Sequence, residues 1–246
     1  MHTFTCNVCD SACRAEVLER ETPSCARCGS NVRFRWIVQA LSVALFGEGL
    51  PLTKFRTRKD IRGLGLSDPI PIAAVLAKKF DYRNTFFNRE PRFDIMADVA
   101  TAGQYDFIVA SEVFEHVVPP VQTAFDNLAR LLKPGGVAIF SSPWEPDGET
   151  VEHFPLLHDW QLVKLQSGYV LVNRTADRRL ETFEDLNFHD GPGSTLEMRV
   201  FSRAGLLANC AAAGFEGISM AEDNAAFGIV WEPWARGFVL RKSHRA

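Results

Sequence analysis

From residue 60 onward, short apolar segments alternate with amphipathic segments in which apolar residues recur at helical spacing. This order is typical of a parallel sheet with helices on both faces. The expected strands are 61–66, 83–88, 105–111 and 137–143, and the expected helices are 71–80, 120–133 and 202–214. Two last segments, 215–222 and 228–242, are expected to pair as an antiparallel edge. The pattern predicts an α/β fold with a doubly wound, mostly parallel sheet.

Two stretches depart from this alternation. Apolar residues at helical spacing over 33–49 predict a helix that bridges an N-terminal segment and the large domain. The stretch 144–200 is longer than the fold needs between a strand and the next helix, and its segments 161–174 and 179–188 predict a small β excursion. The expected division is an N-terminal segment over 1–35, a helical linker over 36–59, and a large domain over 60–246 that contains the insertion 144–200.

The insertion is expected at the sheet edge where loops usually set substrate choice. Its aromatic residues Trp144, Phe154 and Trp160 either line an acceptor pocket or form a small core of the insertion. We favour the core, because aromatic side chains more often serve packing than ligand binding.

Composition narrows the class of protein. Apolar residues make up 46% and charged residues 23% of the 246 residues, which is an ordinary globular balance. The net charge of −3 argues against a nucleic-acid binder that works by bulk charge. No apolar run approaches the roughly 20 residues of a membrane-spanning helix, and the first residues lack the pattern of a signal peptide. We expect a cytoplasmic protein that neither enters a membrane nor binds nucleic acid.

Five of the six cysteines lie in the first 28 residues. Cys6 with Cys9 and Cys25 with Cys28 form two C-x-x-C pairs at a spacing typical of a zinc ribbon. Two disulfides are the alternative, which a reducing cytoplasm disfavours. Four thiolates leave Zn²⁺ no open coordination position, so the predicted zinc is structural.

The two remaining cysteines, Cys13 and Cys210, stand outside these C-x-x-C pairs. Cys13 replaces a ligand, joins a redox pair or has no role, and we favour no role. Cys210 lies in an alanine-rich stretch and is expected to be a buried apolar residue. The predicted zinc ribbon also offers a surface for a protein partner.

The first predicted strand of the large domain ends in the sequence GLGLSDP, residues 63–69. Gly63 and Gly65 allow the backbone to approach a ligand at the start of the following helix. Asp68 stands where a dinucleotide-binding loop has its third glycine, which disfavours a pyrophosphate and favours a cofactor with a positive charge. A strand end with two turn glycines is the other interpretation.

Residues 105–144 carry a Tyr-Asp opening, a Glu-His pair after a strand, and Leu-Lys-Pro-Gly-Gly before the next strand. This combination resembles the fourth strand, helix and fifth strand of class I S-adenosylmethionine-dependent methyltransferases of the type 11/12 kind. The resemblance implies a Rossmann-like fold with a seven-stranded sheet over about 60–242, and S-adenosylmethionine as the cofactor.

The resemblance also implies roles for single residues. Gly63 and Gly65 match the glycine loop beside the methionine portion and ribose of the cofactor. Asp94 resembles the carboxylate that contacts the adenine amino group, and Glu112 matches the loop that closes over the methionine end. No acid ends the second strand, and Glu90 is the nearest candidate for the ribose hydroxyls. These departures leave room for a degenerate cofactor site.

Methyl transfer needs alignment of the reactants and, for a hydroxyl acceptor, one base. The candidate bases are His116, His153 and His158. Each of them, and also His189, either acts in the reaction or serves as a structural hydrogen-bonding residue. A second metal site made by histidines with Asp159 and Asp190 is disfavoured, because no ligand spacing supports it.

The expected reaction is methylation of an oxygen or carbon atom of a small-molecule or glycan-like acceptor. Nitrogen is less expected, because the chain reads SEVFEH after the fourth strand and not the Asn-Pro-Pro-Tyr type of loop. One alternative is a non-catalytic binding module, in which the zinc ribbon docks a partner on a methyltransferase-fold scaffold. Another is a nicotinamide-dependent oxidoreductase, which the missing third glycine disfavours.

Overall fold

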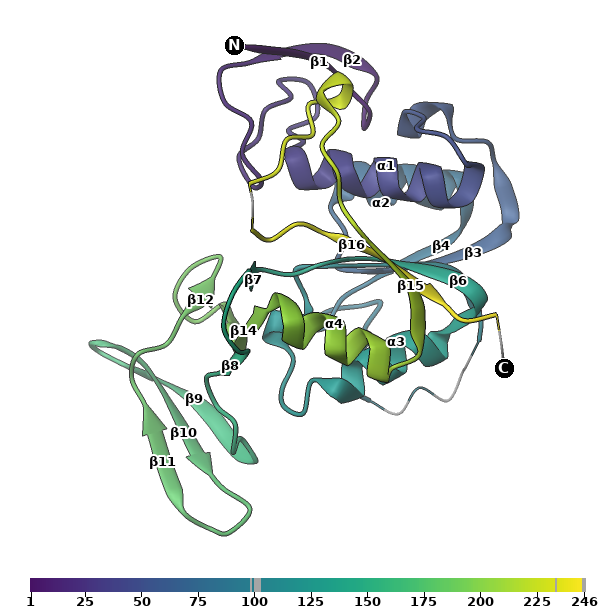
Figure 1. Cartoon of the computed structure of the whole chain (residues 1–246). Helices are drawn as coiled ribbons and strands as arrows, with labels where there is room; N and C mark the ends of the chain where they lie inside the picture. Colours follow the sequence, from purple (N-terminus) through teal and green to yellow (C-terminus); the bar gives the residue numbers. More distant parts are fainter. Residues whose placement is uncertain (98, 100–102, 233, 245–246) are drawn as a thin grey trace.

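The computed structural model describes residues 1–97, 99, 103–232 and 234–244. Its centre is a sheet in the order β15-β16-β6-β5-β3-β4 (Figure 1). The parallel strands are β3 (Arg58–Leu66), β4 (Phe80–Thr85), β5 (Tyr105–Ser111) and β6 (Leu132–Ser141), and the antiparallel ones are β15 (Phe215–Met220) and β16 (Phe238–Lys242). The predicted mostly parallel α/β fold is confirmed.

The sheet has six strands in the described part of the chain, where the resemblance implied seven. Between β4 and β5, the described residues contribute only an isolated bridge from Phe86 to Arg92. A proline, Pro91, lies within this segment, and its missing N–H and fixed φ disfavour a regular strand there.

Helices cover both faces of the sheet. Figure 1 shows α1 (Val32–Phe46) and α2 (Ile70–Lys79) on one face, and α3 (Gln122–Leu131) and α4 (Arg203–Ala212) on the other. Successive residues of β5 alternate between the two hydrophobic cores, with Phe107 in the core under α1 and Ile108 in the core under α3. This strand is buried on both sides, as expected at the centre of a parallel sheet.

Helix α1 confirms the helix predicted over 33–49 and ends three residues earlier. Asn31 caps its start by accepting a hydrogen bond from Phe34 N, and Gly47 ends it in the left-handed conformation. Trp36 of α1 packs edge-on against Trp231, with 5.7 Å between the ring centroids. The helix shares one hydrophobic core with the sheet, and the division at residues 35 and 59 stays a prediction.

The N-terminal segment packs on this helix. It contains a hairpin of β1 (His2–Cys6) and β2 (Ser11–Ala15), and η1 (Leu52–Lys54) follows α1. The buried guanidinium of Arg35 donates to Gly228 O at 2.8 Å and lies 4.6 Å from the Phe4 ring. It therefore connects α1 to the N-terminal hairpin and to the segment before β16.

Several strand boundaries differ from the prediction. Strand β3 begins at Arg58 instead of 61, and β6 begins at Leu132 instead of 137. Strand β4 occupies Phe80–Thr85 instead of 83–88, because Phe80 and Tyr82 face the core while Phe87 is 64% exposed. Strand β16 begins only at Phe238. The earlier part of the predicted segment follows η3 (Ala225–Phe227) and buries Trp231 against α1.

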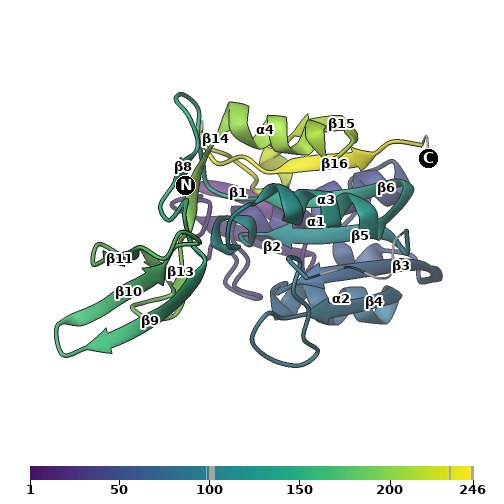
Figure 2. The ribbon, with the colours of Figure 1, turned by 90° about the horizontal axis from the view of Figure 1, so that it is seen from below.

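The insertion is a set of small sheets beside the sheet edge at which the parallel strands end (Figure 2). Its strands are β7 (Trp144–Glu145), β8 (Val151–Glu152), β9 (Asp159–Leu165), β10 (Gly168–Arg174), β11 (Leu180–Phe183), β12 (Phe188–His189), β13 (Thr195–Leu196) and β14 (Arg199–Ser202). Phe154 belongs to a separate small core with Leu171, Leu196 and Met198. Trp144 joins the main core and Trp160 is 38% exposed, so these three aromatic residues do not share one pocket.

In the described ranges, no helix has the length and apolar character that crossing a membrane requires.

Candidate functional site

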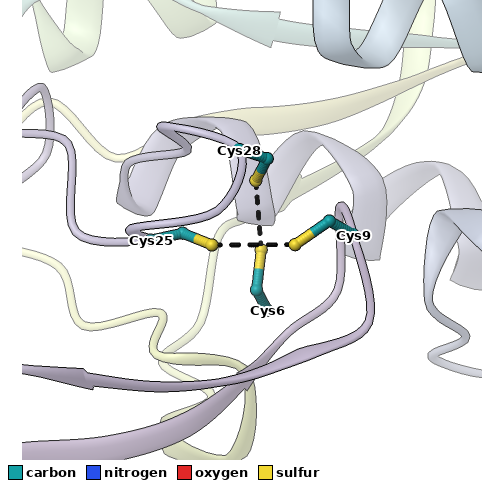
Figure 3. A group of neighbouring side chains, drawn as sticks. All are labelled: Cys6, Cys9, Cys25 and Cys28. Atoms are coloured by element: carbon teal, nitrogen blue, oxygen red, sulfur yellow. Dashed lines mark hydrogen bonds between the residues drawn. The ribbon is translucent and has the colours of Figure 1, made fainter.

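The predicted zinc ligands come together. The sulfur atoms of Cys6, Cys9, Cys25 and Cys28 lie within 4.8 Å of one another (Figure 3). The Sγ–Sγ distances are 3.6 Å from Cys6 to Cys28 and from Cys9 to Cys25. A tetrahedral Zn²⁺ with bonds of about 2.3 Å requires sulfur separations of about 3.8 Å, so the cluster fits a zinc ion.

Two short turns present these thiols. Asp10 N donates to Cys6 O at 2.7 Å, and Gly29 N donates to Cys25 O at 2.8 Å. Gly29 has a φ of 69°, which favours glycine at this turn. Cys6 ends β1 and packs in the core with α1 and the sheet, so the cluster links the N-terminal hairpin to the rest of the molecule.

The other two cysteines lie outside this group of four. Cys13 Sγ donates to Cys25 Sγ at 3.5 Å, which places it beside the cluster. Cys210 is fully buried in the core between the sheet and α4, as the sequence predicted.

The two glycines of the first loop contact other parts of the protein closely. A Cβ at Gly63 would lie 2.2 Å from Phe107 Cζ, so Gly63 serves packing inside the sheet. A Cβ at Gly65 would lie 2.0 Å from Tyr82 Oη, 2.6 Å from Asp68 Oδ2 and 2.7 Å from Asn84 Oδ1. The space over Gly65 therefore holds side chains of the chain itself.

These side chains form a hydrogen-bonded group. Tyr82 Oη donates to Asp68 Oδ2 at 2.5 Å, and the Asn84 amide binds the backbone of Asp68 on both sides, accepting from its N and donating to its O. Burial raises the pKa of Asp68 to about 7, although the hydrogen bond from Tyr82 opposes this. A carboxyl group with this pKa is partly neutral near pH 7.

Glu112 directly follows β5 and lies where the resemblance places the methionine end of a cofactor. Arg20 of the N-terminal segment binds this carboxylate through two hydrogen bonds, of 2.9 Å from Nη1 and 2.5 Å from Nη2. Ser141 Oγ donates to it at 2.8 Å. Burial alone would raise the pKa of Glu112, but the charge and hydrogen bonds of Arg20 lower it below its usual range.

A second arginine reaches the same edge. Arg33, in the first turn of α1, donates from Nη1 to Ser111 Oγ at 2.7 Å and pairs with Glu21 at 2.7 Å. Neither arginine was predicted from the sequence as a site residue. Both lie in an ordinary charged stretch before or at the start of α1, and no spacing pattern connects them with Glu112.

The other two predicted cofactor carboxylates make local contacts. Glu90 is exposed and accepts from Arg92 N at 3.0 Å, and Asp94 accepts from Met96 N at 2.9 Å. These bonds hold the loop between β4 and β5. The cofactor-binding roles of Glu90 and Asp94 stay predictions.

Three histidines gather around Glu197. His153 Nε2 lies 3.0 Å from Glu197 Oε1, and His189 Nε2 lies 3.0 Å from Glu197 Oε2. The ring of His116 stands edge-on to that of His189 with 4.5 Å between centroids. His158 is exposed and uses its backbone N–H to bind Asn173 at 2.9 Å, so it lies apart from this cluster.

Electrostatics differ among these groups. Burial lowers the pKa of His116, whereas the hydrogen bond with Glu197 raises the pKa of His189. Burial opposes ionisation of Glu197, but hydrogen bonds led by that of His189 lower its pKa to about 2. Neutral imidazole is therefore favoured at His116 and a charged pair at His189.

Glu115 completes this region, although the sequence did not single it out. It lies in η2 (Phe114–His116), accepts from Ser142 Oγ at 2.9 Å, and has a side chain only 1% exposed. Burial, together with the charge of Glu112, raises the pKa of Glu115 well above its usual range. The signal in the sequence is the Glu-His pair after the strand, of which only the histidine was predicted to act.

A separate groove of about 690 Å³ lies between the start of α3, the loop after β7 and α4. Gln122, Thr150 and Asn209 are among its lining residues. None of the predicted site residues lines it.

Comparison with protein families gives a match over most of the large domain. A family model described as a methyltransferase domain matches residues 58–220. The chain belongs to this methyltransferase family. The match spans the parallel strands, Glu112 and the histidine cluster, and it confirms the methyltransferase resemblance. A comparison with curated proteins finds no match.

Several solved methyltransferases are similar to this methyltransferase fold. The 1,6-didemethyltoxoflavin N1-methyltransferase of Burkholderia thailandensis is 15% identical with a TM-score of 0.46, over 84% of this chain and 77% of that chain. An amino pentose methyltransferase of Micromonospora echinaspora is 15% identical with a TM-score of 0.48, over 87% and 93%. A sugar N-methyltransferase of a Streptoalloteichus species is 15% identical with a TM-score of 0.44, over 85% and 88%. At these scores the likenesses carry no argument about the reaction.

Proposed function

We propose that this methyltransferase moves a methyl group from S-adenosylmethionine to an oxygen or carbon atom of a small-molecule or glycan-like acceptor. The proposal rests on the charged edge after β5, where Arg20 binds Glu112 and Arg33 binds the neighbouring Ser111. Ser111 and Glu112 lie within the matched family domain. S-adenosylmethionine supplies the methyl group on a sulfonium and also carries an amino-acid end with one ammonium and one carboxylate.

The residues at this edge fit such an amino-acid end. Glu112 would bind the ammonium, and Arg20 with Arg33 would bind the carboxylate, because opposite charges in a partly buried site attract strongly. In the structure Arg20 pairs with Glu112, and Arg33 pairs with Glu21. The N-terminal zinc-ribbon segment would then contribute directly to cofactor binding through Arg20.

His153 is the best-placed base for a hydroxyl acceptor. Glu197 holds its Nε2 at 3.0 Å, and a carboxylate in this position stabilises the imidazolium that forms when the other ring nitrogen takes a proton. His153 is also tied to the segment after β5, because His153 N donates to Met198 O and Met198 N donates to Glu115 O. The proton of the acceptor hydroxyl would go to His153 as the acceptor oxygen bonds the methyl carbon and the bond between that carbon and the sulfonium sulfur breaks.

One observation favours a second candidate function, a non-catalytic binding module on a methyltransferase scaffold. Tyr82 and Asp68 fill the space over Gly65, which is where the glycine loop of the resemblance lies against its cofactor. A cofactor that needs this space would have to displace both side chains. The two candidates differ in a single measurable property, the binding of S-adenosylmethionine.

Calorimetric titration of the zinc-loaded protein with S-adenosylmethionine tests the proposal. We expect micromolar binding that weakens at least about 10-fold in Glu112→Gln, which corresponds to a loss of about 1.4 kcal/mol. Glu184→Gln, a change of an exposed carboxylate, should bind as the unmodified protein does. The absence of binding heat at millimolar cofactor would support the scaffold function instead.

Formation of S-adenosylhomocysteine in the presence of acceptor panels then tests the acceptor class. Hydroxylated sugars and phenols should support turnover better than matched amino sugars. His153→Gln should lower kcat at unchanged cofactor affinity, because the base acts only in the chemical step. Preferential turnover of the amines would contradict the proposed acceptor.

A further inference from the structure

We propose that Glu115, His116 and His189 form a binding site for a divalent first-row transition-metal cation, distinct from the cysteine cluster. One ligand atom from each of these side chains lies within 4.8 Å of the others. Glu115 and His116 come from η2, which follows β5, and His189 comes from β12 of the insertion. Two imidazoles and one carboxylate are ligands that Zn²⁺, Fe²⁺ and related cations share in proteins.

The buried carboxylate gives the independent reason for a ligand here. Glu115 Oε1 has no hydrogen-bond partner among the described residues, although the side chain is 1% exposed. This oxygen faces the imidazole of His116, whose Nε2 lies 3.7 Å away. A buried carboxyl oxygen without a partner is unfavourable, and a cation bound between Oε1 and Nε2 would satisfy it.

The surrounding groups hold both imidazoles as ligands are usually held. His116 Nδ1 lies 2.9 Å from Leu196 O, which leaves Nε2 directed toward Glu115. Glu197 binds the ring of His189 at 3.0 Å, and Glu197 is itself held by Asn187 at 2.9 Å. Histidine ligands typically donate their second ring nitrogen to a carboxylate or carbonyl in this way, which fixes the tautomer and the ring orientation.

Three protein ligands leave open positions on the cation. Glu112, which lies three residues before Glu115 in the chain, marks the edge where the methyl donor is proposed to bind. A cation beside this edge would bind an acceptor oxygen and lower the pKa of its hydroxyl group. This role rests on the proposed function, whereas metal binding itself does not.

Cobalt binding to protein loaded with one equivalent of Zn²⁺ tests the site. Zn²⁺ in the cysteine cluster blocks that site, and Co²⁺ bound by nitrogen and oxygen ligands gives visible d–d absorption without sulfur-to-cobalt charge transfer. We expect one further equivalent of Co²⁺ with this spectrum. Glu115→Gln and His189→Gln should each weaken its binding at least 100-fold, and Glu197→Gln should weaken it about 10- to 100-fold as a positioning residue.

The controls separate metal binding from folding and from methyl transfer. His158→Gln changes an exposed histidine outside the cluster and should leave cobalt binding unchanged. Thermal unfolding should show that Glu115→Gln stays folded, because it replaces a buried carboxyl group that has one unpaired oxygen with an amide of the same shape. Cobalt titration requires no S-adenosylmethionine, so its outcome is independent of the cofactor test.

Two results would overturn the proposal. One is the absence of nitrogen- or oxygen-bound Co²⁺ at millimolar metal, including the case in which charge-transfer bands show cobalt only in the cysteine cluster. The other is equal cobalt affinity in the unmodified protein, Glu115→Gln and His189→Gln.

Discussion

Among the described residues, two clusters of side chains could hold a metal ion, and they are built in opposite ways. The four cysteines lie within 23 residues of sequence, whereas Glu115 and His189 are separated by 74 positions in the numbering and belong to different parts of the fold. The ligand atoms of both clusters lie within 4.8 Å of one another. The cysteine cluster is therefore brought together by local sequence spacing, whereas the cluster of Glu115 and His189 is brought together by the tertiary structure.

The surroundings of the two clusters also differ, in how each is connected to a hydrophobic core. Cys6 and Cys25 are themselves members of the hydrophobic core under α1, so a metal there would join the two short turns to that core. Glu115 follows Phe114, which is fully buried in a core already formed by β5, β6 and α3. A metal in the first cluster is expected to support folding, and a metal in the second to bind to a folded site.

Removal of cysteine ligands should have the largest effect. Cys25→Ser combined with Cys28→Ser should eliminate the zinc and unfold the N-terminal segment, because structural zinc contributes apparent binding free energies of about 10–16 kcal/mol. The free energy of unfolding of a typical domain is only about 5–15 kcal/mol, so loss of the metal is comparable to loss of the whole stability. Metal content by emission spectrometry and urea unfolding measure the two effects. Unchanged zinc content would contradict the zinc-ribbon prediction.

The Arg20–Glu112 pair connects the two regions and should have the next largest effect. Arg20→Ala leaves Glu112 buried without its partner, for which we expect a loss of about 3–5 kcal/mol in the free energy of unfolding. The double change of Arg20→Met with Glu112→Gln should recover most of that loss, since it removes the uncompensated charge. Urea unfolding measures both.

Arg14→Ala provides the matched control for this pair, because Arg14 is exposed and surface changes usually shift stability by less than about 0.5 kcal/mol. A loss of stability in Arg20→Ala no larger than in Arg14→Ala would show that the pair contributes nothing.

The predicted fold followed from patterns that repeat locally. Strand β5 was predicted at its observed bounds, because its run of apolar residues is buried on both faces. Helices α2, α3 and α4 each begin and end within about two residues of the prediction. Strand β4 was displaced by three residues, since Phe86 and Phe87 resemble strand residues in sequence although only tertiary packing decides which phenylalanines are buried.

The candidate site was predictable only in part, for the same reason. Cys6, Cys9, Cys25 and Cys28 were identified because two C-x-x-C pairs carry the ligand geometry in their spacing. A metal site made by histidines of the insertion with Asp159 and Asp190 was disfavoured, because no ligand spacing in the sequence supports it. The carboxylate beside His116 and His189 is Glu115, and only the fold brings it there.

Asp68 provides a prediction on the pH dependence of stability. The pKa of Asp68 is about 7 in the folded protein, compared with the usual value of 3.8 that we assume for the unfolded chain. Between pH 3.8 and pH 7 the folded state therefore holds a proton that the unfolded state has lost. Stability from this group is therefore present below pH 3.8 and is lost as the pH rises toward 7. At 1.36 kcal/mol per unit, the loss is at most about 4 kcal/mol.

Asp68→Asn should remove this slope while it keeps an acceptor for Tyr82. The measurement is the free energy of unfolding from pH 4 to pH 8, compared with the unmodified protein. Asp60→Asn, a change of an exposed carboxylate, should leave the slope over this range unchanged. Parallel pH profiles for Asp68→Asn and the unmodified protein would contradict the burial effect on Asp68.

Cys13→Ser should have the smallest effect on stability. It tests whether the ligands of the cysteine cluster are those that the sequence spacing predicts. Cys13 Sγ lies 3.5 Å from Cys25 Sγ but outside the group of four, so it donates to a ligand without being one. A serine hydroxyl can make the same hydrogen bond, and we expect a change below about 1 kcal/mol in the free energy of unfolding. Zinc content per chain, measured beside that of Cys25→Ser, should equal that of the unmodified protein. If zinc is lost from Cys13→Ser and retained in Cys25→Ser, then Cys13 is the ligand and the two C-x-x-C pairs do not define the metal site.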